Sequence, residues 1–578
     1  MSASATSRPA SALWRVETPL AKAVGEAITA AWGIAPPLEP AATIEMPDQP
    51  AFGDLACTMA MKLAKPLKQS PLQIAQQLVH ALAPALTAPP LAAAVATVEI
   101  KPPGFINLFL TREALASVLH DILKFGEQFG RSTLGHGQRV SIEFVSANPT
   151  GPLSIAHGRQ AAVGDALARL LRFAGCEVCR EYFLNDEGAQ MDLLGESLHA
   201  RYRELAGHAA LIPENGYQGA YLADIAQEIR EREGDRWLTT DRAHAMPHFR
   251  DLAIAALLDV IKEDLRLFDV SFDRWTSQAQ LRRDGKVEEV IAALRAKGAV
   301  YEADGAVWFK ATALGDEKDR VLRKQDGAWT YVAPDIAYHQ DKFTRQFDRL
   351  IDLWGPDHHG YIPRLKAAVE ALTGRGKDVT VLIVQLVTLF RRGVPAPMST
   401  RQGQFVTLRE LMDEVGKDAA RFLFLTRRIE SHLDFDLELA KEQSPENPVY
   451  YVQYAHARVC SILQFHAEHQ GASAIRERAM DASLLSQPEA LELLRSLRQF
   501  PLVIELCARQ LDPYTMTAYL RQLAATFHGF YTKHRVVTED AALTAARVAL
   551  ITGVRRVLAT GLSLLGVSAP QEMIKSDA

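Results

Sequence analysis

The feature that most constrains the fold is the stretch from residue 140 to residue 191. Residues 140–145 are apolar and β-prone, which is typical of a buried strand. A tight loop is expected at Asn148-Pro149-Thr150-Gly151-Pro152, because such a run neither continues a strand nor starts a helix cleanly. Apolar residues then recur at helical spacing after His157, Gly175 supplies a stop, and a second β-prone run follows at 177–184. This order predicts the opening unit of a doubly wound parallel sheet.

The loop in this unit suits a phosphate group. Free N–H groups at a helix N-terminus favour negative charge, and His157 adds an imidazole at that end of the helix. Gly158 is expected to let the backbone approach a ligand closely. Neither G-x-G-x-x-G nor G-x-x-x-x-G-K-[ST] occurs, so the loop is neither a dinucleotide fingerprint nor a P-loop. An ordinary strand-to-helix turn with a capping histidine is the competing interpretation at this point.

Composition narrows the class of protein. The formal net charge of −5 gives no global basic signal, so a nucleic-acid partner would have to meet a local patch. Five cysteines in 578 residues argue against a disulfide scaffold, and the lone C-x-x-C at Cys176 and Cys179 has no second pair at zinc spacing. The sequence shows no secretory leader pattern and no apolar run long enough to span a bilayer. We therefore expect a cytoplasmic protein without a membrane partner.

The patterning divides the chain into three expected domains. Residues 1–120 mix helical and β-prone segments, enough for a small α+β domain. Residues 121–430 carry the sheet, with a charge-rich helical insertion at about 192–290, and residues 431–578 are almost wholly helical. The predicted class is α/β, with a Rossmann-type parallel sheet, a small α+β N-terminal domain and an all-α C-terminal helix bundle.

Polar residues follow the expected strands of the middle domain. After a hairpin around Asp304-Gly305, strands are expected at 329–333 and 350–354, with a helix at 335–343. Asp335 then follows one strand, and Asp357, His358 and His359 follow the other, where ligands of open α/β sheets bind. Adjacent loop residues cannot readily aim all their side chains at one ion, so we expect no metal site here.

Two further segments have both a functional and a plain interpretation. The run 391–403 is rich in Gly, Pro, Ser and Arg after an expected strand, which is typical of a mobile functional loop or of a solvent connector. In the helical region, aromatic and basic residues interleave near Tyr454 and Arg458 and again near Tyr531 and Arg535. Such side chains stack on the bases of single-stranded RNA, although core aromatics with solvated arginines give the same pattern.

At this level of detail the chain resembles arginyl-tRNA synthetases of the bacterial type. The resemblance runs over nearly the whole sequence in the family's order. Its motifs are Gly53-Asp54-Leu55-Ala56, Pro103-Gly104-Phe105-Ile106-Asn107, Glu143-Phe144, Ser146-Ala147-Asn148-Pro149-Thr150-Gly151-Pro152, His157-Gly158-Arg159, Asn185-Asp186, Tyr331 to Asp335, Trp354 to Tyr361, Phe405-Val406-Thr407-Leu408, Pro448 to Arg458 and Gly566-Val567-Ser568-Ala569-Pro570.

The resemblance implies a ligase that uses ATP with Mg²⁺, bound mostly by the phosphates, and no metal held by the protein. Arginine would first form arginyl-adenylate, in a step that itself depends on tRNA, and then pass to the 3′ end of the arginine tRNA. The partners implied are arginine, ATP and that tRNA, and we expect a monomer. The first domain would be a tRNA-contacting domain and the last an anticodon-binding domain.

Site residues carry over by position in the family motifs. The arginine site would be Glu143, Ser146, Asn148, Tyr331 and Asp335. A carboxylate at Asp335 suits the planar guanidinium fork and disfavours lysine. The ATP site would be Ala147, Asn148, Pro149, Thr150, Gly151, Pro152, Leu153, Ser154, Ile155, Ala156, His157, Gly158, Gly355, Asp357, His358 and Met398. The catalytic residues would be His157, Ser154, Ser399 and Arg401, and the tRNA contacts Tyr454, Arg458, Tyr531 and Arg535.

The chain departs from the family at two phosphate motifs. The H-x-G-H signature has Ser154 and Ala156 in place of its first histidine and its glycine, and the K-M-S-K loop reads Pro397-Met398-Ser399-Thr400. Losing one transition-state donor commonly costs about 3–4 kcal/mol of barrier. Arg391, Arg392 and Arg401 are the cations expected to take over. Two hypotheses remain: an active synthetase with rerouted phosphate contacts, and a non-catalytic paralogue that binds tRNA or arginine.

Overall fold

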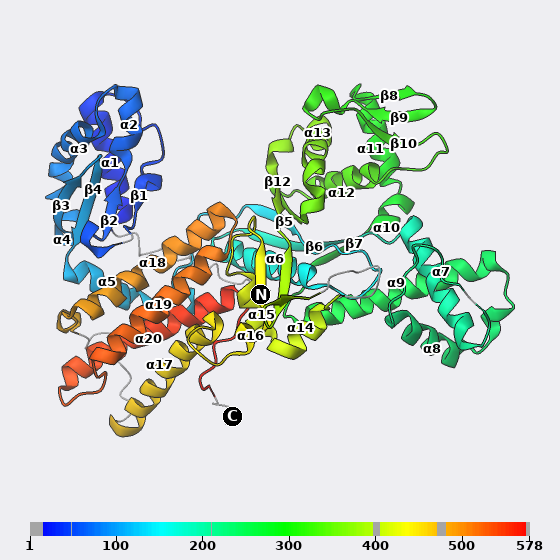
Figure 1. Ribbon diagram of the computed structural model, residues 1–578. Coiled ribbons are helices and arrows are strands. Elements are labelled where there is room, and N and C mark those ends of the chain that lie inside the picture. The colour runs from blue at the N-terminus through cyan, green and yellow to red at the C-terminus, as the bar shows by residue number, and fades with distance from the viewer. Residues whose placement is uncertain (1–15, 48, 210, 397–404, 471–480, 574–578) are drawn as a thin grey trace, which may run out of the picture.

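A computed structural model of the chain describes residues 16–47, 49–209, 211–396, 405–470 and 481–573. The N-terminal part is a four-stranded antiparallel sheet in the order β1-β2-β4-β3 with helices packed on it, and it forms a lobe of its own in the ribbon view (Figure 1). Ion pairs from Asp54 to Arg495 and from Glu17 to Arg498 join this lobe to α18. The N-cap Ser70 and Pro71 in the first turn start its α3 helix. Its elements are α1 (Glu17–Trp32), β1 (Ile44–Glu45), β2 (Leu55–Cys57), α2 (Met59–Leu67), α3 (Pro71–Leu86), α4 (Leu91–Ala94), β3 (Val95–Lys101) and β4 (Phe105–Leu110).

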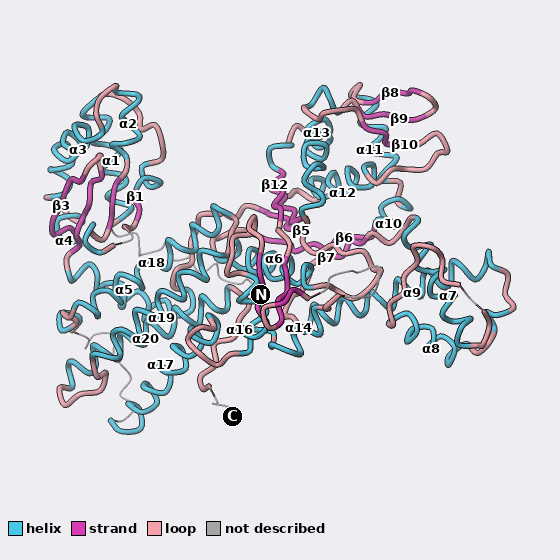
Figure 2. Tube along the Cα trace, viewed as in Figure 1, coloured by secondary structure: helices cyan, strands magenta, loops and turns pink. Residues whose placement is uncertain are grey.

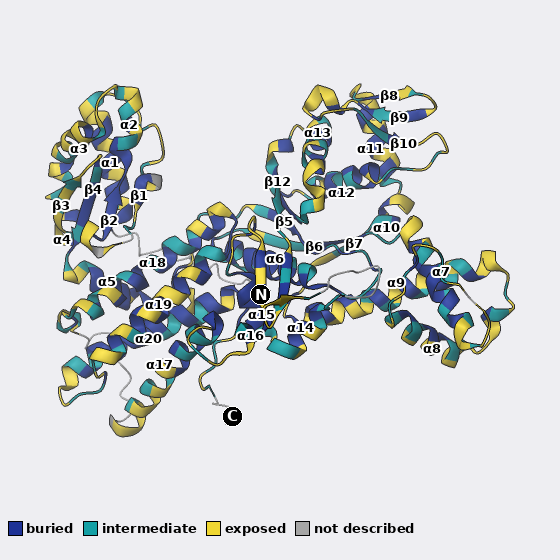
Figure 3. Cartoon of the chain, viewed as in Figure 1, coloured by how far each residue is buried: buried dark blue, intermediate teal, exposed yellow. Residues whose placement is uncertain are grey.

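A five-stranded parallel sheet forms the centre of the molecule (Figure 2). Its order is β12-β11-β5-β6-β7, with β5 (Arg139–Glu143) in the middle. The predicted strand–loop–helix–strand unit is present as β5, α6 (Ile155–Phe173) and β6 (Glu177–Leu184). Most of α6 is buried against the sheet and later helices, and Gly164 allows it to lie directly on the ring of Phe144 (Figure 3).

Helices α7–α9 come between β6 and β7 and form a lobe with its own apolar core. The lobe ends before β7 (Arg274–Ser277), which pairs with β6 in the central sheet. The helical insertion therefore ends before Arg274 and not near residue 290. The predicted boundary was too late because β7 is a short polar strand, without the apolar run that would have marked it in the sequence. The helices are α7 (Ala189–Leu205), α8 (Tyr221–Glu233) and α9 (Arg242–Leu267).

In the segment after β7, the predicted hairpin is present but one predicted strand is not. Strands β8 (Val300–Ala303) and β9 (Ala306–Phe309) form the hairpin, with positive φ at Asp304 and Gly305. The strand expected at 329–333 is wrong: only Trp329 makes an isolated bridge, and helix α12 (Val332–Thr344) has begun by Val332. Asp335 therefore lies in the first turn of a helix and does not follow a strand. The neighbouring elements are α10 (Gln278–Arg283), α11 (Lys286–Ala296), β10 (Arg320–Arg323), β11 (Arg349–Trp354), α13 (Ile362–Thr373) and β12 (Val379–Ile383).

The rest of the chain is a small sheet followed by a helix bundle. Strand β13 pairs with β14 and with β15, and α17–α20 pack together and against α5 and α6. No helix in the described residues is both long and apolar enough to cross a membrane. The elements are α5 (Arg112–Phe125), β13 (Val387–Arg391), β14 (Val394–Pro395), α14 (Leu408–Val415), α15 (Lys417–Phe424), β15 (Leu433–Asp436), α16 (Leu437–Lys441), α17 (Pro448–Gln470), α18 (Pro488–Gln510), α19 (Tyr514–Lys533) and α20 (Ala541–Leu564).

Candidate active site

The strand order of the central sheet reverses between β5 and β11. From β5 the chain adds β6 and β7 on one side, and later β11 and β12 on the other. The carboxyl ends of β5 and β11 are Glu143 and Trp354, so these residues open onto the same edge of the sheet. Open α/β sheets bind ligands in the crevice at such a switch point.

The backbone turns sharply where it leaves β5. Val145 and Ser146 both have positive φ, of 68° and 38°, which is rare for a non-glycine residue and costly for a β-branched one. The turn aims Ser146 back at the strand: its Oγ donates to Glu143 Oε1 at 3.0 Å and accepts from the N–H of Phe183 at 3.1 Å. Local strain of this kind is characteristic of functional sites and here orients Glu143.

Side chains from three other elements hold the loop at 147–152. The Tyr182 hydroxyl donates to the carbonyl of Ala147 at 2.8 Å, and the Tyr221 hydroxyl donates to the carbonyl of Thr150 at 2.7 Å. Asn148 donates from Nδ2 to Gln190 Oε1 at 2.8 Å. The loop is thus fixed to β6, α7 and α8.

The loop ends at the N-terminus of α6, where Ser154 is the N-cap. His157 Nδ1 accepts from the Ser154 N–H at 3.2 Å, which is one half of a capping box and leaves Nε2 as the protonated nitrogen. Burial lowers the pKa of His157 to about 4, although Asp357 opposes the shift. His157 is therefore a neutral hydrogen-bond donor at physiological pH, and the capping interpretation and the ligand interpretation of this histidine are compatible.

Gly158 has a packing role that the sequence did not predict. A side chain at Gly158 would meet Leu408 Cδ1 at 2.7 Å and the ring of Phe424 at 3.2 Å. The glycine therefore allows α6 to pack on α14 and α15, and its close approach to a ligand stays a prediction. The N–H of Leu408 also donates to the carbonyl of Leu153 at 2.7 Å, which fastens the end of the loop to the start of α14.

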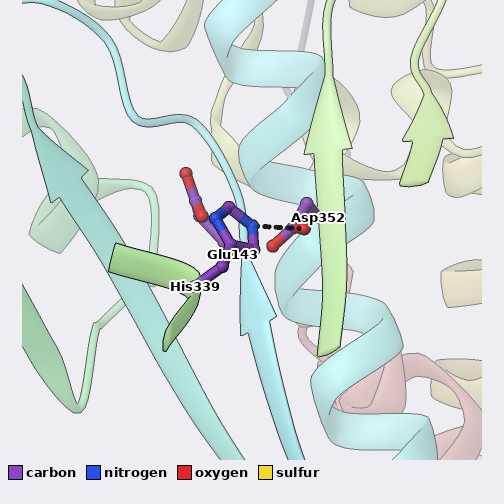
Figure 4. A group of neighbouring side chains, drawn as sticks. All are labelled: Glu143, His339 and Asp352. Atoms are coloured by element: carbon purple, nitrogen blue, oxygen red, sulfur yellow. Dashed lines mark hydrogen bonds and ion pairs between the residues drawn. The ribbon is translucent and has the colours of Figure 1, made fainter. Parts of the chain in front are cut away.

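Beside Glu143 lies a buried ionic cluster that the sequence did not predict. Lys342 Nζ is 2.7 Å from Glu143 Oε2 and 2.9 Å from Asp352 Oδ1. His339 Nε2 lies 3.1 Å from Asp352 Oδ2, and the His339 Nδ1 bonds the carbonyl oxygen of Asp335 at 2.8 Å. Figure 4 shows how Glu143, His339 and Asp352 converge from α12 and the two central strands. The contacts thus run from the Glu143 carboxylate through Lys342, Asp352 and His339 to the backbone carbonyl of Asp335.

Charge sets the protonation states of this cluster. Burial raises the pKa of Asp352, but the Lys342 ammonium and His339 outweigh it and bring that pKa below its usual range. Burial raises the pKa of Glu143, against the opposing effect of Lys342. The ligand atoms of Glu143, His339 and Asp352 lie within 4.8 Å of one another, a spacing that would suit a metal ion. The Lys342 ammonium already bridges both carboxylates, so these residues do not fit a metal.

Asp335 lies at the far end of the cluster with two tyrosines. Asp335 is half-buried and burial raises its pKa, while the predicted partner Tyr331 is 67% exposed. The Tyr331 hydroxyl accepts from Arg364 Nη1 at 3.0 Å, and the Arg364 guanidinium covers the ring of Tyr361 at 4.7 Å. Burial raises the pKa of Tyr361 well above its usual value, so its hydroxyl stays neutral beside Asp335.

The loop after β11 approaches α6 from the other side. Asp357 and His358 are exposed and form a pair at 3.3 Å, Nε2 to Oδ2. A side chain at Gly355 would collide with Asp357 Oδ1 and would come within 3.8 Å of Gln160 on α6. Gly355 thus lies near Gln160 on α6, and Asp357 is close enough to His157 to act on its pKa.

Part of the predicted set cannot be placed. Met398, Ser399 and Arg401, with Pro397 and Thr400, lie outside the described residues. Of the cations expected to take over from the missing lysines, Arg391 binds Glu414 through two hydrogen bonds of 2.8 and 2.7 Å. Arg392 has positive φ in the turn between β13 and β14. Arg391 is thus already paired with a carboxylate.

The aromatic and basic residues of the helix bundle form a cluster across α17 and α19. The Arg458 guanidinium lies 5.3 Å from the Tyr531 ring and 5.8 Å from the Tyr454 ring. Tyr454 stacks on His528 at 5.8 Å. Arg458 is exposed and both tyrosines are half-buried, whereas Arg535 is exposed beyond the end of α19.

Sequence signals for the missed residues were present. Asp335, His339 and Lys342 have the i, i+4, i+7 spacing of one helix face, and Asp352 interrupts an apolar strand. A charged residue inside a parallel strand needs a buried partner.

Comparison with known proteins agrees with this arrangement. Three family models match the chain: "Arginyl tRNA synthetase N terminal domain" at residues 18–110, "tRNA synthetases class I (R), catalytic domain" at 118–429, and "DALR anticodon binding domain" at 452–573. The arginine–tRNA ligase of Desulfosudis oleivorans is 48% identical over 92% of this chain and 94% of that protein. That of Syntrophotalea carbinolica is 47% identical over 92% and 95%.

Solved structures share the fold at lower identity. The arginyl-tRNA synthetase of Thermus thermophilus matches with a TM-score of 0.75 and 22% identity, over 96% of this chain and all of that one. That of Plasmodium falciparum matches with a TM-score of 0.72 and 13% identity, over 97% and 99%. With a catalytic-domain model over more than half of its length and curated relatives at nearly half identity, the chain belongs to the bacterial-type arginyl-tRNA synthetases, a family of class I aminoacyl-tRNA synthetases.

Proposed function

We propose that the chain ligates arginine to its tRNA in two steps. The arginine carboxylate attacks the α-phosphate of ATP, the bond to the β-phosphate breaks, and arginyl-adenylate and pyrophosphate form. A hydroxyl of the 3′-terminal ribose then takes the arginyl group, and AMP leaves. The observation that carries this proposal is the contact chain from Glu143 to Asp335 at the switch point of the sheet.

Arginine is assigned to the crevice above β5 and β11. Its guanidinium would meet Asp335 and the hydroxyl of Tyr331, because a carboxylate and a planar donor fork form directional charge-assisted bonds. Its α-ammonium would meet Glu143, which Ser146 orients, with Asn148 nearby on the held loop. A lysine side chain would present a compact ammonium and leave part of the fork site unfilled.

ATP is assigned to the loop 147–158 and to Gly355, Asp357 and His358. His157 would donate from Nε2 to a phosphate oxygen as a neutral group, at the positive end of α6. Met398, Ser399 and Arg401 would approach from the loop after β14. Magnesium would arrive with ATP and be held mostly by the phosphates.

The remaining partner is tRNA. The helix bundle offers a cation among aromatic rings, because Arg458 lies over the rings of Tyr454 and Tyr531, and this arrangement suits splayed RNA bases. The exposed Arg535 would add a phosphate contact. All residues of the proposed arginine site come from one chain, so a monomer suffices. The cysteines are free thiols, which fits the reducing cytoplasm where tRNA is charged.

The test is arginine-dependent exchange of pyrophosphate into ATP, with and without arginine tRNA. We expect exchange that requires arginine and is stimulated by the tRNA. Well-folded protein that gives no exchange with cognate tRNA present would refute the proposal.

The non-catalytic alternative rests on Ser154, Ala156, Pro397 and Thr400. Ser154 still caps α6 and positions His157, so the helix end that faces the proposed phosphates is formed without the first signature histidine. A module that binds only tRNA has no use for a strained turn whose Ser146 orients Glu143 at the end of β5. The ligase is therefore favoured.

A further inference from the structure

The ionic cluster beside the crevice is built as a rigid unit. Asp335, His339 and Lys342 occupy one face of α12, and at about 1.5 Å per residue they span roughly 10 Å along the helix. Asp352 reaches the same face from the middle of the central sheet. His339, Lys342 and Asp352 are each 1% exposed or less. The links are direct hydrogen bonds and ion pairs, and the last one reaches the backbone carbonyl of Asp335, so the cluster ties the start of α12 at Asp335 to Glu143 on β5.

The charges of the cluster do not balance. Two carboxylates, Glu143 and Asp352, bond to the Lys342 ammonium and the His339 imidazole, and the Asp335 carboxylate lies close enough to His339 and Lys342 to interact with their charges. Even with His339 protonated the group lacks at least one positive charge, and buried charge without a partner is costly. The two ends of the cluster are Glu143 at the carboxyl end of β5 and Asp335 in the first turn of α12. An incoming molecule with a cation at each end would supply the missing charge.

Lys342 itself cannot reach a ligand. It is fully buried, it contacts Glu143 and Asp352, and its ammonium lies 4.1 Å from the Tyr338 ring. His339 is used from both nitrogens. Both side chains therefore act on a substrate only through the carboxylates that they hold.

We propose that Lys342, His339 and Asp352 are positioning residues that fix the separation of Glu143 and Asp335 and thereby select the length of the substrate side chain. The inference rests on the proposed function and deepens it. In this proposal Glu143 binds the α-ammonium of the substrate and Asp335 binds its guanidinium. Lys342, His339 and Asp352, which we call the spacer, therefore set the distance between the two binding positions. A longer homologue such as homoarginine then fits only one end at a time.

A matched control for Lys342 is available three residues along the chain. Arg345 follows α12 and binds the fully buried Glu181 of β6 at 2.8 and 3.0 Å. Glu181 pairs in register with Glu143, so the two ion pairs lie side by side on the same sheet. Arg345 does not join Glu143 to Asp335. Lys342→Met and Arg345→Met therefore remove comparable ion pairs, but only the first breaks the spacer.

The experiment measures pyrophosphate exchange with arginine and with homoarginine for the wild type and both variants. For Lys342→Met we expect the KM for arginine to rise ~10²-fold, with the KM for ATP within about twofold. One extra methylene is usually rejected by about 10–200-fold, and we expect this preference to fall roughly tenfold in Lys342→Met and to persist in Arg345→Met. Equal shifts in the two variants, or an unchanged preference for arginine, would overturn the inference.

A second pair of variants covers the case in which Lys342→Met does not fold. His339→Gln keeps a donor to Asp352, whereas His339→Leu removes it. We expect His339→Leu to lose preference for arginine over homoarginine and His339→Gln to recover most of it. Identical behaviour of the two would refute the spacer. Absence of exchange in the wild type would instead refute the proposed function, so the two failures are distinguishable.

Discussion

Two buried ion clusters in this molecule, around Arg421 and around Lys342, differ in how their charges are neutralised. Arg421 on α15 binds Asp165 of α6 at 2.6 Å and donates to the carbonyls of Phe268 and Leu565, at 2.8 and 3.1 Å. Every contact of this cluster is internal. Lys342 instead serves two carboxylates and leaves negative charge at the crevice. A closed cluster, whose charges are met internally, joins parts of the fold, whereas an open cluster, short of positive charge, suits a cationic ligand.

The closed cluster shapes the chain around it. Gly566 has a φ of 69°, and a side chain there would come within 2.1 Å of Arg421 Nη2. The guanidinium therefore lies directly against the backbone that follows α20. Packing on Arg421 thus accounts for the glycine that begins the family motif at 566–570.

Breaking the closed cluster should have the largest effect on stability. Arg421→Met removes a buried cation from Asp165 and the donor to the carbonyls of Phe268 and Leu565, although Arg169 and Arg180 still pair with Asp165 at 2.7 and 3.4 Å. Removing one partner of a buried pair typically costs about 3–5 kcal/mol, and with these two arginines retained we expect a loss near the lower end of that range. We expect this loss in urea unfolding, with exchange activity per folded molecule retained at low temperature. Arg391→Met, which removes an exposed pair with Glu414, is the control and should unfold like the wild type. A stable Arg421→Met protein that had lost arginine binding would reverse the roles assigned to the two clusters.

The open cluster should respond in binding rather than in stability. Asp335→Asn keeps the shape of the side chain but removes the charge offered to the guanidinium, and a hydrogen bond to a charged group contributes about 1.5–3 kcal/mol. We therefore expect the KM for arginine to rise roughly 10- to 10²-fold, with little change in the KM for ATP. Steady-state exchange kinetics at varied arginine and varied ATP measure both. An equal rise in the two constants would contradict the assignment of Asp335.

The smallest expected effect concerns His157, the neutral histidine in the first turn of α6. Its pKa is about 4 in the folded protein and about 6.5 in an unfolded chain, so the unfolded state binds more protons between these values. The free energy of unfolding that neutral His157 contributes is therefore fully present above pH 6.5 and is lost as the pH falls towards 4. Melting temperatures of the wild type and His157→Gln should converge over this window. A constant difference would mean that His157 titrates normally.

The sequence predicted the elements that depend on local pattern. The unit from β5 to β6 is recognisable because an apolar strand, a proline-rich loop and a helical period follow one another within 52 residues of chain, 140–191. Strand β7 was missed because Arg-Trp-Thr-Ser has no apolar run and forms a strand only by pairing with β6. The strand expected at 329–333 failed because Thr330 bonds to Val321 and Leu322 and the chain then turns directly into α12.

The residues of the candidate active site divide in the same way, into those that local motifs indicate and those that only the fold brings together. Glu143 and Asp335 could be named from motif positions, but their connection could not, since it runs through Lys342 and Asp352, which are distant from Glu143 in sequence. A lysine in a helix is normally solvated, and only the fold shows that this one is enclosed by two carboxylates. Likewise, the packing role of Gly158 could not be predicted, because its packing partners, Leu408 and Phe424, lie about 250 residues away in sequence.

The most direct test of the central claim is a crystal structure of the protein with arginine bound. We expect a guanidinium within hydrogen-bond distance of Asp335 and an α-ammonium at Glu143, with Lys342 still bridging Glu143 and Asp352. Arginine bound elsewhere, or with its guanidinium turned away from Asp335, would contradict that claim.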